Sequence, residues 1–394
     1  MSGKMEKLPK SPSRQTEDFI YLVACALENR IPDLQKVNQM NLEQMYRLSR
    51  RHFMSAMIYM VLAQSGIWNE KTNDGEKDFV EKWKEKKEKI IRTTLLMDAE
   101  SQALYQYMEE NAIWYMPLKG AIMASFYPRY GMREMSDRDI LYDATYQKQL
   151  CEWMKERGYS AKSVGVGNHD VYEKMPVYHF EMHTGLFDKS REKWYRYYRN
   201  IKQRLIRDEK INYRYHFSDE DFYIYMIVHM YKHLQNAGTG IRGLADLYLY
   251  LKEKNSVLDW VYIRREVKKL DVDAFEQISR SLCQKLFWNV QTDLTQKEQI
   301  QLDYMLESGV YGTLSNYMEN EAKKIRKESQ NAMQARLKYI WKNMFLTPEQ
   351  RERINPFLRH KWSIPFWVLY RSGRAVLFKR SVIKTKLEIL RKIK

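Results

Sequence analysis

Apolar residues recur every three or four positions along most of this chain, which is the period of a helix with one buried face. In the first part of the chain this spacing predicts helices over residues 19–27 and 42–62, and Gly66 follows the second helix as a C-cap. A charged stretch over residues 76–110 keeps the same period, and we interpret its Lys/Glu run as a solvated helix face. Residues 1–110 are therefore predicted to form an N-terminal helical region.

Between residues 111 and 210 the pattern changes to short apolar or alternating runs that end in turn-forming residues. Four strands are predicted there, over residues 113–118, 140–142, 171–174 and 178–183. The last two flank Met175-Pro176 as in a hairpin, and a predicted helix over residues 147–157 ends at Gly158. Strands that alternate with a helix in this way indicate a compact α/β core.

Helical spacing returns after Asp208. Ser218 and the three acidic residues that follow it predict a helix start, because serine caps first-turn amides and acidic side chains favour a helix N-terminus. That helix is expected to run to about Leu234, and further helices are predicted over residues 241–252, 260–270, 274–290 and 296–306. We therefore predict a helical domain over residues 211–310 and a helical extension over residues 311–394. The fold class is α+β and mainly helical, with a small mixed-sheet core between helical regions.

Composition excludes several classes of protein. The chain has 15 glycines and 9 prolines in 394 residues, and 44% of its residues are hydrophobic. Collagen-like, low-complexity and all-β chains do not combine so few turn-forming residues with so large an apolar fraction. The length is sufficient for two or three packed units, each with its own core.

The cysteines and the chain start bear on the cellular compartment. Cys25, Cys151 and Cys283 lie far apart and form no CxxC pair, which is typical of a reducing compartment. The start of the sequence lacks the apolar segment of a secretory signal, and no run of 18 apolar residues occurs. We therefore expect a cytoplasmic protein.

The positive charge is concentrated near the end of the sequence. The formal net charge is +17, and residues 351–394 hold 13 Lys/Arg against two acidic residues, so the other 350 residues carry only +6. Three interpretations of this basic tail stay open: a terminal helix with a solvated basic face, a nucleic-acid contact, and a segment on an anionic membrane.

The acidic residues Asp137 and Asp139 are separated by one position and run into an apolar strand. Residues two apart on a strand point to the same face, so their carboxylates can hold Mg²⁺ together. A two-metal site needs further oxygens, and Glu181 on the strand over residues 178–183 is the candidate third carboxylate. The alternative is structural, because Ser-Asp-x-Asp is also common at turns and helix N-caps.

Upstream of this pair, Lys119 and Gly120 lie where a predicted strand passes into a helix. A glycine at such a junction lets the backbone approach a phosphate, and the following helix start favours an anion.

These residues resemble a known family. The positions that carry the resemblance are Leu118, Lys119, Gly120, Tyr127, Pro128, Arg133, Ser136, Asp137 and Asp139. Together they resemble the uncharacterised nucleotidyltransferase family of the polymerase-β-like superfamily. The resemblance continues in Glu181 and His183, and then in His229, His233 and residues 240–251. It extends over residues 15–380, but only residues 116–142 are specific.

The resemblance implies a metal-dependent nucleotidyl transfer at the edge of a small mixed sheet, in a nucleotidyltransferase core over residues 111–210. Asp137 and Asp139 would bind Mg²⁺ or Mn²⁺, and Glu181 would complete the metal site or activate the attacking hydroxyl. The donor would be an NTP, and the acceptor a small molecule, RNA or protein. The residues implied to contact the nucleotide are Lys119, Gly120, Arg133, Ser136 and Arg242. Lys119 and Gly120 stand where the superfamily usually has Gly-Ser, which leaves the nucleotide-binding mode open.

Two other functions are consistent with the sequence. One is a His/Glu metal hydrolase, because His179, Glu181 and His183 alternate on a strand while His229 and His233 share a helix face. The other is a non-catalytic scaffold whose basic tail binds nucleic acid.

The helix that begins near Arg242 also has two interpretations. Arg242 and Asp246 are four residues apart, which predicts an ion pair within that helix. The same two residues, with one of the helical histidines, are also candidates for the lining of a cleft that faces the sheet.

Overall fold

The computed structural model describes residues 13–70, 74–165, 167–288, 293–310, 312–345, 364–370 and 380–392. The chain divides into two compact units: Met1–Tyr231 with Gly240–Leu306, and Lys232–Thr239 with Glu307–Lys394. The mainly helical α+β class predicted from the sequence is confirmed.

Helices form the N-terminal part of the first unit. They are α1 (Arg14–Leu27), α2 (Leu34–Asn38), α3 (Leu42–Arg51), α4 (Ser55–Gln64), α5 (Ile67–Glu70) and the 37-residue α6 (Asp74–Glu110). The single helix predicted over residues 42–62 is wrong, because Phe53 has a φ of 55° and separates α3 from α4. The long helix predicted over residues 76–110 is confirmed as α6.

The sheet has five strands in the order β1 (Tyr115–Pro117), β2 (Arg138–Tyr142), β5 (Tyr178–His183), β4 (His169–Lys174) and β3 (Ser160–Ser163). It is mixed, because β2 and β5 run parallel while the other neighbours are antiparallel. The hairpin predicted around Met175-Pro176 is confirmed as β4–β5. Strand β3 was not predicted, since Ser160–Ser163 is a polar edge segment without an alternating apolar pattern.

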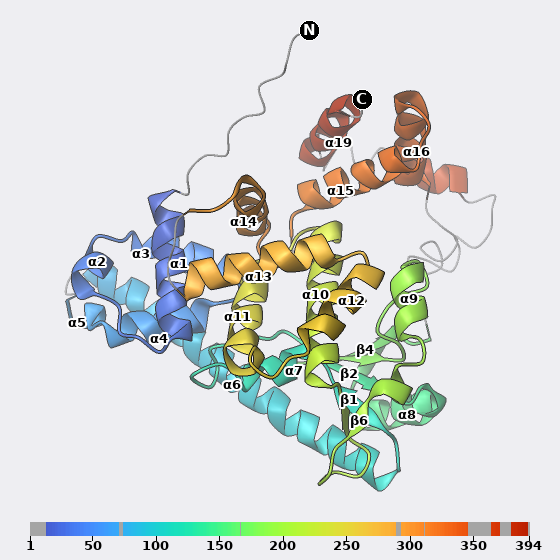
Figure 1. The fold of residues 1–394 in the computed structure, drawn as a ribbon, viewed down its shortest axis with the longest axis horizontal. Coiled ribbons are helices and arrows are strands. Elements are labelled where there is room, and N and C mark those ends of the chain that lie inside the picture. The colour runs from blue at the N-terminus through green and yellow to red at the C-terminus, as the bar shows by residue number, and fades with distance from the viewer. Residues whose placement is uncertain are drawn as a thin grey trace. The chain divides into compact units, whose positions relative to one another are not determined.

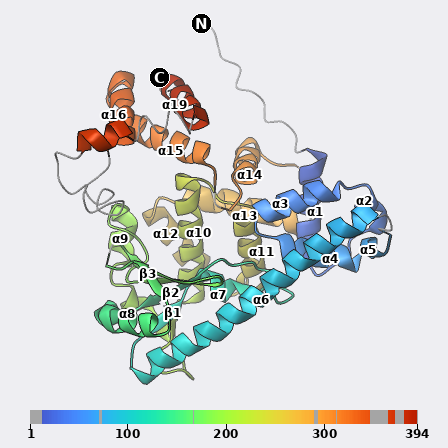
Figure 2. The same ribbon diagram turned by 180° about the vertical axis from the view of Figure 1, so that it is seen from behind.

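One face of the sheet carries the core. Ile140, Phe180 and Met182 are buried there against residues of α6 and of α8 (Gln147–Glu156). Figures 1 and 2 show α6 running from the N-terminal helices past the sheet, with α8 beside it. Because side chains alternate along a strand, Asp139, Glu181 and their neighbours at even spacing lie on the opposite face.

The remaining elements of the first unit follow the sheet in the chain. They are α7 (Lys119–Ala124), which follows β1, then α9 (Glu192–Tyr198), the short pair β6 (Ile206–Arg207) and β7 (Tyr215–His216), α10 (Asp219–Asn236), α11 (Arg242–Lys254), α12 (Trp260–Lys269), α13 (Asp273–Phe287) and α14 (Gln296–Ser308). The last residues of α10, from Lys232, and of α14, from Glu307, belong to the second unit. The predicted start of α10 is confirmed, because the Asp221 amide donates to Ser218 Oγ. Figure 1 shows α10 beside the strands, on the side away from α8.

The second unit contains α15 (Leu314–Lys327), α16 (Ala332–Met344) and α19 (Arg380–Lys392). Its small core includes Met318, Ile325, Tyr339 and Ile389. Of the basic tail over residues 351–394, residues 351–363, 371–379 and 393–394 lie outside the described residues, and its nucleic-acid contact stays a prediction. Within the described parts of the chain, every helix is too short or too polar to span a bilayer.

Candidate active site

Two parallel strands bring the central acidic residues together. The β2–β5 register sets Asp139 opposite Glu181 and Leu141 opposite His183. His183 Nε2 lies 2.8 Å from Asp139 Oδ1 and 3.8 Å from Glu181 Oε2. One ligand atom from each of Asp139, Glu181 and His183 lies within 4.8 Å of the other two. Two carboxylates and one imidazole therefore meet at a single point on the face of the sheet opposite the core.

Asp137 precedes β2 and belongs to the same electrostatic site. Burial raises the pKa of Asp137, and the nearby Asp139 carboxylate raises it further, while Arg242 and a hydrogen bond with Ser136 act in the opposite direction. Burial likewise raises the pKa of Glu181, and the charges of Asp139 and Asp137 add to that effect. The structure thus brings all three predicted carboxylates within electrostatic range of one another. Their mutual repulsion is the condition that a divalent cation relieves.

The donor atoms fit a divalent metal. Carboxylate oxygens suit Mg²⁺ and Mn²⁺, and an imidazole nitrogen adds affinity for Mn²⁺ and later transition metals. From the sequence, His183 was named in the family resemblance and in the hydrolase alternative, but not as a ligand of the acidic site. Its alternation with Glu181 on one strand was the signal that it could share the acidic site.

A second histidine lies beside this group. His169 on β4 pairs in register with His183, and their ring centroids are 5.1 Å apart. His169 Nε2 lies 3.7 Å from Glu181 Oε2, so both imidazoles lie near the same carboxylate oxygen.

The helical histidines do not join this group. We call Asp139, Glu181 and His183, which together could hold a metal ion, the metal-competent group. Among the described residues, this group includes neither His229 nor His233. His229 instead lies against Tyr225 on α10, with ring centroids 5.7 Å apart. The five-residue His/Glu site of the hydrolase alternative is therefore not assembled in the described structure.

Arg138 lies between the two aspartates in sequence but on the other face of the strand. Its guanidinium is 2% exposed and pairs with Asp98 of α6 at 2.7 Å. This ion pair links β2 to α6. Arg138 therefore does not lie on the face of β2 that carries Asp139 and the rest of the metal-competent group.

The Lys119-Gly120 turn has protein partners. Lys119 Nζ lies 3.6 Å from Asp246 Oδ2, and burial lowers the pKa of Lys119 to about 8. The Gly120 carbonyl accepts a 3.0 Å hydrogen bond from Arg133 Nη1. A Cβ on Gly120 would lie 3.3 Å from that nitrogen and from Met135 Sδ, so the glycine permits a close approach of Arg133. The helix that follows, α7, has six residues.

Asp246 on α11 is the centre of a buried polar network. Arg133 donates to both of its oxygens at 2.9 Å, and the Tyr127 hydroxyl donates to Oδ1 at 2.9 Å. Burial alone would raise the pKa of Asp246, but Arg133 and Lys119 outweigh it and hold that pKa well below its usual range. The polar residues Lys119, Tyr127 and Arg133, separated in sequence, therefore share one partner on a distant helix.

The predicted Arg242–Asp246 ion pair is absent from the ion pairs of the described residues. Arg133 and Lys119 occupy the Asp246 carboxylate, and Arg242 donates to the Glu134 carbonyl at 2.7 Å. The charges of Arg133 and Arg242 both act on Asp137. Positive charge thus borders the acidic group on the side of α11.

The family model of an uncharacterised nucleotidyltransferase family matches residues 38–288. The chain belongs to this family. No curated protein and no solved structure matches the chain. The resemblance noted in the sequence is therefore confirmed at the level of the family. In this nucleotidyltransferase family member, the matched residues include the whole five-stranded sheet, the metal-competent group and the Asp246 network.

Proposed function

We propose that this protein transfers a nucleoside monophosphate from an NTP to an acceptor hydroxyl, with Mg²⁺ or Mn²⁺ bound by Asp137, Asp139 and Glu181. One observation supports this most directly: the parallel register of β2 and β5 puts Asp139 and Glu181 side by side, with Asp137 in electrostatic range. The chain's membership of a nucleotidyltransferase family favours the same reaction class.

When bound, the divalent cation would neutralise negative charge on the phosphates during an in-line displacement. Asp139 would provide a carboxylate ligand and His183 Nε2 a nitrogen ligand. Asp137, whose pKa the Asp139 charge raises, would add a second carboxylate. Glu181 would complete the metal site or take the proton of the attacking hydroxyl, and its raised pKa suits the second role. The acceptor oxygen forms a bond to the α-phosphorus, the bond to the β-phosphate oxygen breaks, and pyrophosphate leaves.

The other proposed nucleotide-contacting residues divide into two groups. Ser136 is exposed next to Asp137, and the charge of Arg242 acts on Asp137. We propose that both residues contact the triphosphate. Lys119, Gly120 and Arg133 are held by Asp246, and we propose that they position β2 and contribute positive charge to the triphosphate site.

The test incubates the purified protein with each α-³²P-labelled NTP, Mg²⁺ or Mn²⁺ and cell extract, and identifies the fraction that keeps the label. We expect one NTP to label an acceptor and Asp139→Asn or Glu181→Gln to lower the rate by about a thousandfold, since ligand loss removes transition-state charge stabilisation.

Glu173→Gln is the matched control, because Glu173 is a carboxylate on the neighbouring strand β4 outside the metal-competent group. It should keep the full rate. Equal labelling by wild type and Asp139→Asn, or no labelling and no Mg-NTP binding by the intact protein, would refute the proposal.

A further inference from the structure

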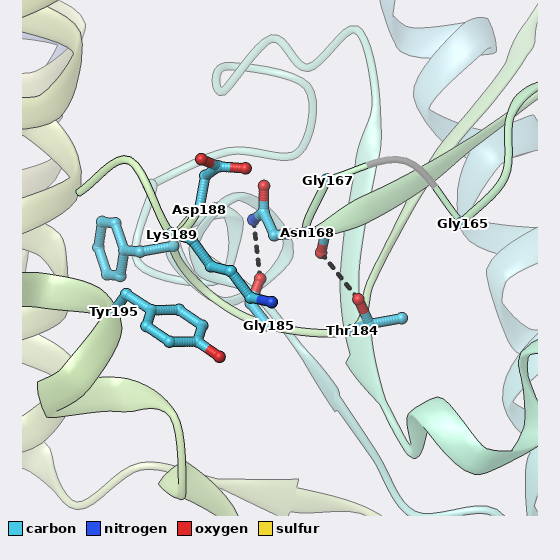
Figure 3. A pocket seen from close by; sticks show the side chains of 9 residues that line it. Gly165, Gly167, Asn168, Thr184, Gly185, Asp188, Lys189 and Tyr195 are labelled. Carbon is cyan, nitrogen blue, oxygen red and sulfur yellow. Dashed lines mark hydrogen bonds between the residues drawn. The ribbon is translucent and has the colours of Figure 1, made fainter. Parts of the chain in front are cut away.

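A pocket of about 470 Å³ opens where β5 ends (Figure 3). Asn168 precedes β4 and contributes to one side of it. The residues that follow β5, from Thr184 to Lys189, form another side, and Tyr195 of α9 closes the third. A volume of this size lies in the range of small-molecule sites, roughly 300–1,000 Å³.

Two residues that line the pocket are adjacent in sequence to histidines of the acidic site. Thr184 directly follows His183, and Asn168 directly precedes His169. These two histidines lie 3.8 Å and 3.7 Å from the Glu181 carboxylate. The pocket lining therefore begins one residue along the chain from each of the two histidines that lie near Glu181.

The walls of the pocket are held by hydrogen bonds and packing within the protein. Asn168 Nδ2 donates to the Gly185 carbonyl at 2.8 Å, and the Thr184 amide donates to the Asn168 carbonyl at 2.9 Å. Phe187 is 3% exposed and packs on Trp194 of α9, with ring centroids 5.5 Å apart. These contacts hold both sides of the pocket in place without a ligand.

Two polar groups are available in this pocket. In Figure 3 the Lys189 ammonium and the Tyr195 hydroxyl are both directed toward Gly185, while the Asp188 carboxylate lies on the other side. Asp188 accepts a hydrogen bond from the Ser190 amide at 2.8 Å. The nearby Lys193 is paired with Asp271, whereas Lys189 has no ion pair among the described residues. An ammonium and a phenol beside an aromatic wall suit a small anionic ligand.

We propose that this pocket binds the acceptor of the transfer reaction, a small hydroxyl compound whose carboxylate or phosphate group contacts Lys189. This inference rests on the proposed function, because Glu181 is the group that would take the acceptor's proton. We assign the acceptor to the small-molecule class, because a pocket of about 470 Å³ matches the size of a small-molecule site.

The first test measures binding without catalysis. Lysine acetylation is followed by peptide mass spectrometry in the presence of glycerol 3-phosphate, glycerate or glycerol, which separate the phosphate, carboxylate and neutral cases. We expect one of the two anions to slow acetylation of Lys189 at least threefold and glycerol to have no effect. Lys193, which is 52% exposed, is the internal reference and should not change. Protection of Lys189 by neither anion, or equal protection by glycerol, would overturn the proposal.

The second test uses the transfer assay and separates this inference from the proposed function. We expect Lys189→Gln to raise the acceptor KM about tenfold with kcat little changed, since it removes a charge-assisted contact that ground and transition states share. Lys193→Gln is the matched control and should leave the KM unchanged. Label recovered in RNA or protein, or an unchanged KM in Lys189→Gln, refutes the acceptor pocket while leaving nucleotidyl transfer intact. Retained Lys189 protection with no transfer refutes the proposed function and leaves the pocket as an anion-binding site only.

Discussion

Asp246 is 1% exposed and nevertheless carries a charge, because Arg133 binds both of its oxygens and Tyr127 and Lys119 complete its surroundings. A buried carboxylate with such partners is costly to remove singly, because the partners lose their counter-charge in a place that water does not reach. The residues that surround it come from the segment between β1 and β2, so this one side chain ties that segment to α11.

Asp246→Asn is therefore expected to destabilise the protein by about 3–5 kcal/mol, the usual effect of breaking a buried ion pair. Urea unfolding followed by circular dichroism measures the change. Asp271→Asn is the control, since Asp271 is a 72% exposed partner of Lys193 and exposed pairs contribute about 0–1 kcal/mol. Similar losses in the two variants would contradict this interpretation of Asp246.

His52 predicts a dependence of stability on pH. It is fully buried, stacks on Phe19 and accepts a hydrogen bond from the Ile241 amide, and burial together with the Arg51 charge lowers its pKa to about 3. Its unfolded pKa is about 6.5, so below that pH the unfolded chain binds a proton that the folded protein excludes. Stability should fall as the pH drops from 6.5 toward 3, by about 2 kcal/mol at pH 5 from this residue.

Unfolding of wild type and His52→Gln at pH 7 and pH 5 isolates this contribution. The glutamine keeps an acceptor but does not titrate, so the variant should lose about 2 kcal/mol less than wild type between the two pH values. An identical loss in both proteins would show that other groups carry the pH dependence.

The nitrogen ligand in the metal-competent group can be detected directly. If His183 coordinates Mn²⁺, electron spin echo envelope modulation should show a ¹⁴N coupling that disappears in His183→Ala. His216→Ala is the control, because His216 lies on β7 outside the group. A nitrogen coupling that survives in His183→Ala would remove His183 from the metal site.

At the scale of elements, the β2–β5 pairing and the capping of α4 decide how the site is held. A one-residue slip of β5 against β2 would turn Glu181 toward the core and Phe180 toward the acidic face. The register is therefore held by the buried apolar residues on the opposite face.

Helix α4 follows the break at Phe53, and its N-cap residue Met54 makes no side-chain cap hydrogen bond.

Glu134 supplies the missing cap from a distant segment. It is 7% exposed and accepts a 2.7 Å hydrogen bond from the Ala56 amide, in the first turn of α4. Glu134→Ala should cost about 1.5–3 kcal/mol, as expected for a buried hydrogen bond to a charged group, and thermal unfolding measures it. Glu43→Ala, which removes a 68% exposed partner of Arg47, is the control and should cost about 0.5 kcal/mol or less. Equal losses would argue against the cap.

At the scale of the whole molecule, the matched residues 38–288 lie within a chain that has two compact units. Apart from residues 232–239, that matched stretch belongs to the first unit, and so does the metal-competent group. Metal binding should therefore be coupled to the folding of the first unit.

A metal at 100 times its Kd should stabilise the folded protein by about 2.7 kcal/mol. Differential scanning fluorimetry with increasing MnCl₂ should show a rising Tm in wild type and in Glu173→Gln, and no rise in Asp139→Asn. An equal rise in all three proteins would place the binding elsewhere.

The sequence by itself determined many of the helices, most of the strands and the candidate acidic residues. Those features depend on near neighbours: the apolar period decides helix or strand, and alternation along one strand puts Glu181 on the same face as His183. The register of β2 against β5, which brings Asp139 to that face, is decided by the tertiary structure.

Only the tertiary structure decided the partners. Asp246 lies 113 positions from Arg133, and Glu134 lies 78 positions from Ala56. Such pairs carry no local period, because they exist only where packing brings two segments together and excludes water between them. The partner of Lys119 and the pocket beyond His183 are decided in the same way, since each depends on a contact with a segment distant in sequence.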